Sequence, residues 1–140
     1  MVHDMELVEA TLDDVQEVAK TSISRGLKAL PPNHEWCYAL KHEGIVLGVG
    51  AIRPLTPNAA IVWIDLAEAA RDHMIVVYRL LKDFVEAWLS GHEVVRLMAT
   101  IEPDFAEAIR LVEHLGFHRE SVMARFYGDK DGLMYVRLKE

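Results

Sequence analysis

The chain has 140 residues, of which 51% are hydrophobic, and its formal net charge is −7 at pH 7. This length and apolar content fit one folded domain and exclude a disordered chain. The negative charge disfavours nucleic acid and anionic membranes as partners, and no apolar run approaches the roughly 20 residues of a membrane span.

Cellular setting follows from the cysteine count and the first residues. Cys37 is the single cysteine, so no intrachain disulfide can form, and its apolar neighbours predict a buried structural thiol. The first six residues lack the basic start and apolar centre of a secretion signal. We therefore expect a cytoplasmic protein.

The first half of the chain reads as strands around one helix. Thr11 and Asp14 have the spacing of a capping box, which predicts that a helix starts there. Residues 25–30 are a candidate for a second short helix, ended by Pro31 and Pro32. The Glu43-Gly44 pair suits a tight hairpin turn. Strand patterns occupy residues 5–9, 36–42, 45–53 and 59–66.

The second half alternates helices and strands. An apolar stripe of period 3.6 runs from Met74 to Trp88 and predicts the longest helix, which Gly91 ends. A strand at 93–101 precedes a helix over 105–115, with Pro103 in its first turn and Gly116 as its cap. Strands at 120–126 and 133–138 flank a turn at 128–132. The order implies an α/β chain whose sheet is parallel at its centre and antiparallel on both sides.

The segment at 108–117, Ala-Ile-Arg-Leu-Val-Glu-His-Leu-Gly-Phe, together with this order of elements, resembles the GNAT superfamily, the GCN5-related N-acetyltransferases. The resemblance implies a single α/β (α+β) domain over residues 1–140, with a mixed central sheet of about six to seven strands and helices on both faces. It also implies transfer of an acetyl group from acetyl-CoA to an amine substrate.

The family's cofactor loop, Arg/Gln-x-x-Gly-x-Gly/Ala, aligns with residues 72–77 here, and neither glycine is present. Ile75 and Val77 stand at the glycine positions, so bulky side chains replace the close backbone approach to the pyrophosphate. Strand amides near the end of 59–66 would hold the pantetheine. The cofactor-binding residues that the resemblance implies are Trp63, Ile64, Leu66, Arg71, Asp72, His73 and Met74.

The residues for proton transfer also depart from the family pattern. Where the family has an Asn and a proton-donating Tyr in its last helix, this chain has Phe105 and Val112, and neither can transfer a proton. Asp65 and Glu68 are candidates for the general base, or they are solvated carboxylates at a strand end. Tyr127 is the candidate acid, preferred to Tyr78, which lies on the apolar stripe.

The tail of the chain resembles phage and prophage GNAT-like proteins with a degenerate cofactor loop. The segments that carry this resemblance are 115–117, 120–123, 127–129 and 133–135, with Arg-Asp-His-Met at 71–74 in the loop. It implies an alternative to the enzyme: a non-catalytic virion or assembly component, or a module that binds a phage or host protein.

Metal binding is not expected from the seven histidines. They form no pair at the spacing of helical zinc ligands and have no partner cysteines. His114 and His118 flank Gly116 and need not share a face.

Overall fold

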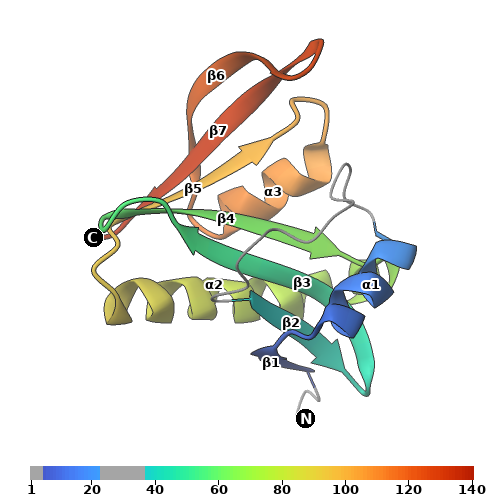
Figure 1. The fold of residues 1–140 in the computed structure, drawn as a ribbon. Helices are drawn as coiled ribbons and strands as arrows, with labels where there is room; N and C mark the ends of the chain where they lie inside the picture. Colours follow the sequence, from blue (N-terminus) through green and yellow to red (C-terminus); the bar gives the residue numbers. More distant parts are fainter. Residues whose placement is uncertain (1–4, 23–36) are drawn as a thin grey trace. The chain divides into compact units, whose positions relative to one another are not determined.

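A computed structural model of the chain describes residues 5–22 and 37–140. Its seven strands form one mixed sheet in the order β1-β2-β3-β4-β5-β7-β6, in which β4 and β5 run parallel (Figure 1). The elements in chain order are β1 (Met5–Glu9), α1 (Leu12–Lys20), β2 (Cys37–His42), β3 (Ile45–Pro54), β4 (Ala59–Leu66), the 3-10 helix η1 (Glu68–His73), α2 (Met74–Gly91), β5 (Arg96–Ile101), α3 (Ala106–His114), β6 (His118–Tyr127) and β7 (Lys130–Leu138). The mixed α+β sheet predicted from the sequence is confirmed, and the candidate helix at 25–30 lies outside the described residues.

Contacts divide the chain into two compact units. The first unit comprises Met1–Arg53 and Trp63–Val77, and the second comprises Pro54–Val62 and Tyr78–Glu140. Strand β4 and helix α2 each contribute residues to both units.

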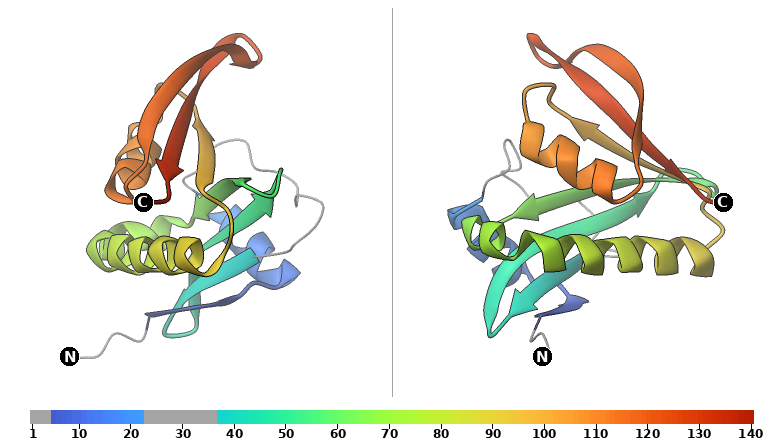
Figure 2. Two further views of the ribbon diagram at one scale, coloured as in Figure 1. Left: turned by 90° about the vertical axis from the view of Figure 1, so that its left-hand side faces the viewer. Right: turned by 180° about the vertical axis from the view of Figure 1, so that it is seen from behind.

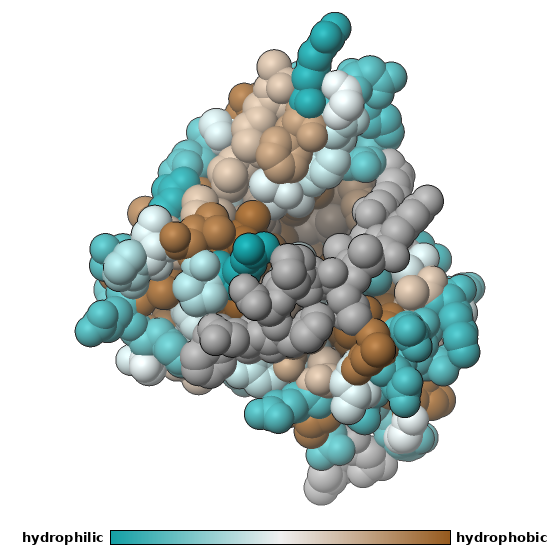
Figure 3. Space-filling view, in the orientation of Figure 1, coloured by the Kyte–Doolittle hydropathy of each residue, from teal (hydrophilic) through white to brown (hydrophobic). Residues whose placement is uncertain are grey.

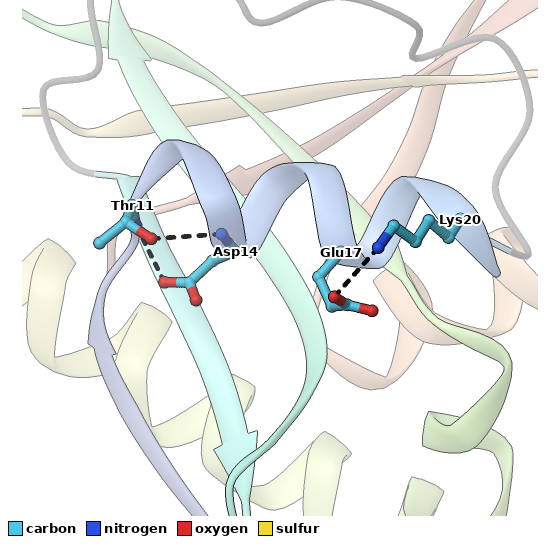
Figure 4. Close-up of polar contacts among 4 residues, drawn as sticks. All are labelled: Thr11, Asp14, Glu17 and Lys20. Carbon is cyan, nitrogen blue, oxygen red and sulfur yellow. Dashed lines mark hydrogen bonds and ion pairs between the residues drawn. The ribbon is translucent and has the colours of Figure 1, made fainter.

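Helix α1 begins at the predicted capping box (Figure 4). The Asp14 amide donates to Thr11 Oγ1 at 3.2 Å, and the Thr11 amide donates to Asp14 Oδ2 at 2.9 Å. Lys41 Nζ on β2 lies 3.3 Å from the other oxygen of this buried carboxylate. Burial raises the pKa of Asp14, but the hydrogen bonds from Thr11 and Lys41 outweigh it, so the pKa is lowered. One carboxylate therefore caps α1 and joins it to the sheet.

The first unit has its core between α1 and the neighbouring strands. Val18 on α1 is fully buried against Ala39 of β2, Val49 of β3 and Ala67. The β2–β3 hairpin turns at Glu43 (φ 50°) and Gly44 (φ 80°), the pair of positive angles that two-residue hairpin loops favour. The hairpin predicted from Glu43-Gly44 is confirmed, and Cys37 is buried as predicted.

The second unit packs α3 alongside β5 and β7 (Figure 2). Arg137 on β7 joins its elements: Nη1 donates to the Leu115 carbonyl at 2.7 Å, and Nη2 lies 3.5 Å from Glu86 Oε2 on α2. Gly116 follows at φ +89°, and a Cβ there would lie 3.1 Å from the Arg137 side chain. The glycine that ends α3 is thus required by its backbone angle and by the packing of Arg137.

Two element boundaries in the second unit differ from the sequence prediction. Pro103 is not in the first turn of α3, because the Phe105 amide donates to the Glu102 carbonyl in a preceding turn and the helix starts at Ala106. The β6–β7 turn is shorter than predicted, since Tyr127 already pairs with Lys130. Gly132 is part of β7, where its bare Cα admits the Phe126 side chain.

Strand β6 ends the sheet order and is exposed along most of its length. Apolar surface lies over the β6–β7 hairpin in the upper part of Figure 3. Val122 and Phe126 of β6 are exposed large apolar side chains. Within residues 5–22 and 37–140, no helix combines the length and apolar character needed to cross a membrane.

Candidate functional site

The carboxyl end of β4 is fixed from two sides. A Cβ on Gly48 of β3 would lie 2.6 Å from Leu66 Cδ2, so β3 and β4 approach closely here. The Ala67 amide donates to the Leu47 carbonyl, and the Glu68 amide donates to the Thr21 carbonyl, each at 2.8 Å. The end of β4 and the start of η1 are therefore held by β3 and by the segment after α1.

The two predicted base candidates differ in solvent access. Asp65 is 1% exposed, and its Oδ1 accepts a hydrogen bond from Ser22 Oγ. Glu68 is exposed at the start of η1. A general base must reach a substrate proton directly or through one water, and Glu68 meets that condition more readily than Asp65. Sequence reasoning missed Ser22, which lies 43 residues from Asp65 and carries no motif.

Residues 72–77, expected in a loop, are helical. Asp72 and His73 end η1, and α2 begins at Met74, whose φ and ψ are those of a right-handed helix. Val77 is completely buried, whereas Ile75 is 69% exposed. The backbone is helical on both sides of Met74, so the amides of the first turn of α2 are not presented by an open loop.

Side chains supply the positive and polar groups at this helix start. Arg71 is exposed on η1, and the ring centroid of His73 lies 4.7 Å from that of His42 on β2. His42 Nδ1 is buried and has no hydrogen-bond partner among the described residues. Sequence reasoning missed His42, because 31 positions separate it from His73.

The predicted pantetheine-binding residues on β4 lie beside β3. Leu66 is buried, and Trp63 packs against the core of the first unit. Trp63 and Ile64 also pass close to Gly50, where a Cβ would lie 3.0 Å from the Trp63 carbonyl oxygen. The strand position predicted for these residues is confirmed, and their contact with a cofactor stays a prediction.

Tyr127, the predicted acid, belongs to the second unit. Its hydroxyl donates to Thr100 Oγ1 at 3.1 Å, and its ring meets Phe126 edge-on with centroids 5.0 Å apart. Burial raises the pKa of Tyr127; the hydrogen bond with Thr100 lowers it, and the charge of Glu102 raises it. The phenol is therefore held protonated at neutral pH. Sequence reasoning found Tyr127 and missed Thr100.

Solved structures share this arrangement of elements. Ard1 from Thermoplasma volcanium is 17% identical, with a TM-score of 0.79 over 98% of this chain and 99% of that chain. RimL, a ribosomal L7/L12 α-N-protein acetyltransferase solved in complex with coenzyme A, is 17% identical, with a TM-score of 0.77 over 98% of this chain and 95% of RimL. A ribosomal-protein-alanine N-acetyltransferase from Brucella melitensis is 21% identical, with a TM-score of 0.70 over 96% of this chain and 99% of the Brucella chain.

The chain has the GNAT acyltransferase fold. No protein-family model matches its sequence, and no curated protein matches it. The likeness is therefore one of structure, at identities that establish the fold alone.

The two positions that the sequence resemblance aligned with an Asn and a proton-donating Tyr of the family carry apolar side chains. Val112 is buried in α3, and Phe105 precedes that helix as its N-cap residue. Neither side chain carries a proton to transfer. Across residues 5–22 and 37–140, no three His, Cys, Asp or Glu side chains gather as metal ligands would.

Proposed function

We propose that this chain is an acyl-CoA-dependent N-acetyltransferase that transfers an acetyl group from acetyl-CoA to an amine. The main support is the GNAT fold, shared over 98% of the chain with a protein solved in complex with coenzyme A. The exposed carboxylate after β4 and the protonated phenol of Tyr127 supply the two proton-transfer groups that such a reaction uses.

The proposed reaction is direct attack of the amine on the thioester. The amine nitrogen forms a bond to the acetyl carbon, the C–S bond breaks, and the amine proton passes to Glu68 or, less accessibly, to Asp65. Tyr127 gives its phenolic proton to the leaving sulfur, so the products are the acetylated amine and CoA. Afterwards the proton held by the carboxylate is lost to water, and water returns one to Tyr127.

We assign acetyl-CoA binding to two segments of the first unit. The amides of Trp63, Ile64 and Leu66 would hold the pantetheine arm, as the resemblance implies. Because the helical backbone at 72–77 leaves no open amide cradle, the phosphates would be bound mainly by side chains. The side chains proposed for that contact are Arg71 and His73, with the positive charge coming from Arg71. Asp72 and Met74 belong to the same cofactor-binding segment by the resemblance, but neither side chain offers phosphate a hydrogen-bond donor.

Peptide α-amines are the acceptors to test first. RimL and the Brucella protein, both similar in structure, are described as acetyltransferases of ribosomal-protein amino groups. The net charge of −7 also favours a cationic acceptor over an anionic one. A short peptide with a free N-terminal alanine is therefore the first acceptor to offer.

Acetyl-CoA binding tests the proposal directly. Acetyl-CoA should raise the melting temperature, because a ligand that binds only the folded state stabilises it. Arg71→Ala should weaken this binding by about tenfold through loss of a charge-assisted contact. The control is Arg79→Ala, which removes an exposed arginine two turns further along. An unchanged melting temperature at millimolar acetyl-CoA would refute the proposal.

Such a failure would favour the alternative of a non-catalytic phage or prophage protein. The alternative rests on the tail segments and on the missing glycines, which are features of the sequence. It predicts that the GNAT fold is kept as a rigid interaction module. Purification of the chain within a large assembly, combined with no acetyl-CoA binding, would support it.

A further inference from the structure

Tyr127 is held by a residue from a strand that does not pair with its own. In the sheet order, β7 lies between β5, which carries Thr100, and β6, which ends at Tyr127. The hydrogen bond from the Tyr127 hydroxyl to Thr100 Oγ1, at 3.1 Å, therefore crosses β7. Regular strand pairing does not bring these two side chains together, so a local feature must aim the phenol at β5.

That feature is an irregularity in β6. Met123 pairs with Gly132 and Tyr127 pairs with Lys130, so residues 124–126 of β6 stand opposite the single residue Asp131. Within this bulge Arg125 has φ +56°, an angle that is unfavourable for a residue with a side chain. Its amide donates to Asp131 Oδ1 at 3.1 Å. Bulges next to functional sites commonly redirect a side chain, and this one turns the end of β6.

Further contacts hold the tip of the hairpin against the end of β5. Lys130 Nζ lies 3.3 Å from Asp104 Oδ2 and 3.7 Å from Glu102 Oε2, just beyond β5. Phe126 fills the space over Gly132, where a Cβ would lie 2.8 Å from Phe126 Cβ. The ring of Tyr127 is thus supported by Phe126, while its hydroxyl is directed to Thr100.

We propose that Thr100 is a positioning residue for Tyr127, orienting the phenol for proton donation and stabilising the phenolate that remains after the proton has left. This inference rests on the proposed function. A threonine hydroxyl suits each stage of the step. It accepts from the resting phenol, and when the phenolic O–H turns towards the sulfur the threonine rotates to donate to the phenol oxygen and then to the phenolate. The protons balance as follows. One proton passes from Tyr127 to the sulfur, Thr100 keeps its own proton while donating a hydrogen bond, and water then returns a proton to Tyr127.

The groups around Tyr127 act on its pKa in opposite directions. Burial raises the pKa of Tyr127, the hydrogen bond with Thr100 lowers it by favouring the ionised form, and the charge of Glu102 raises it. Lys130 lies next to Glu102 and limits the influence of that carboxylate. Removing the Thr100 hydroxyl should therefore leave a phenol that is harder to ionise and less firmly oriented.

The test compares Thr100→Val, which removes the hydroxyl at nearly constant shape, with Thr100→Ser, which keeps it. Ionisation of Tyr127 is followed by NMR of tyrosines labelled with ¹³C at Cζ, with the signal assigned by its absence in Tyr127→Phe. Thr100→Val should raise the pKa of Tyr127, and Thr100→Ser should leave it near the wild-type value. This measurement needs no acceptor and no turnover.

Activity is measured with acetyl-CoA and the alanine peptide. Thr100→Val should lower kcat by about tenfold, with little change in KM for acetyl-CoA, because one hydrogen bond that acts in proton transfer is lost. Thr100→Ser should restore it. In a Tyr127→Phe background, Thr100→Val should have no further effect, because the two residues act through one proton.

The outcomes separate the two proposals. If the wild-type chain transfers acetyl groups and Thr100→Val leaves both kcat and the pKa of Tyr127 unchanged, the role of Thr100 is refuted while the proposed function stands. An effect of Thr100→Val that persists in the Tyr127→Phe background also refutes it. A wild-type chain that neither binds acetyl-CoA nor transfers acetyl groups refutes the proposed function, and with it the assignment of Thr100 to that reaction.

Discussion

Replacing Gly116 with alanine should destabilise the chain for two separable reasons. The backbone at Gly116 has φ +89°, where a Cβ introduces steric strain. In addition, the new Cβ would lie 3.1 Å from Cδ and Nε of Arg137 and 3.3 Å from its Cζ. Arg137 would have to move, and its 2.7 Å hydrogen bond to the Leu115 carbonyl would weaken.

Substitutions at two other glycines of the same unit separate the backbone strain from the contact with Arg137. Gly128 has φ +81°, but a Cβ there would meet nothing within 4 Å, so Gly128→Ala carries the backbone term alone. Gly91 has open space as well and no positive φ, so Gly91→Ala should introduce neither backbone strain nor a steric clash. We expect a loss of about 1 kcal/mol for Gly128→Ala, and up to about 1 kcal/mol of added stability for Gly91→Ala.

Gly116→Ala should lose about 2–3 kcal/mol, because the weakened charge-assisted hydrogen bond adds to the backbone strain. The free energy of unfolding is measured by urea denaturation followed by circular dichroism. A Gly116→Ala variant no less stable than Gly128→Ala would refute this prediction, since the Arg137 contact would then contribute nothing. The prediction also fails if Gly91→Ala loses as much stability as Gly128→Ala.

Two further predictions concern the first unit. Asp14→Asn should lower the free energy of unfolding by about 1–2 kcal/mol at pH 7. The Asn amide oxygen can still accept from the Thr11 amide, but the negative charge that strengthens this bond and attracts Lys41 is lost. Since the folded-state pKa of Asp14 is lowered, its contribution to stability is complete above the ordinary value of 3.8 and is lost as pH falls through the folded pKa. Urea denaturation at several pH values should therefore show the difference in free energy of unfolding between wild type and Asp14→Asn shrinking in acid. A difference that does not depend on pH would contradict this prediction. Burial, with a smaller effect of the Asp14 charge, raises the pKa of the Cys37 thiol, so iodoacetamide should label Cys37 only after denaturation. Labelling is detected by mass spectrometry, and rapid labelling of the native chain would contradict this prediction.

Local signals in the sequence were sufficient for much of the fold. Thr11 and Asp14 predicted the start of α1 because a capping box needs only residues three apart. Glu43 and Gly44 predicted the β2–β3 turn because the loop has just two residues with positive φ. The apolar stripe starting at Met74 predicted α2 because a buried helical face repeats every three to four residues.

Features set by contacts distant in sequence could not be predicted. The 3-10 helix η1 has no side-chain cap, and its start is fixed by hydrogen bonds from Ala67 and Glu68 to carbonyls of other segments. The bulge at Arg125 uses a positive φ at a residue that gives no sequence signal for one. The Thr100–Tyr127 contact depends on that bulge and on the β5-β7-β6 order, so only Tyr127 was found from the sequence.

Under the proposed function, the positions at which the sequence departs from the family pattern place the chemistry on other residues. Ile75 and Val77 stand where the resemblance places glycines, η1 runs directly into α2, and Arg71 is the cationic side chain that we propose for the phosphates. Val112, at the position where the resemblance places a tyrosine, is buried in α3 and has no proton to donate. A donor on β6 then needs its own means of orientation, because an edge strand has a neighbour on one side only. The strained bulge at Arg125 and the hydroxyl of Thr100 supply that orientation.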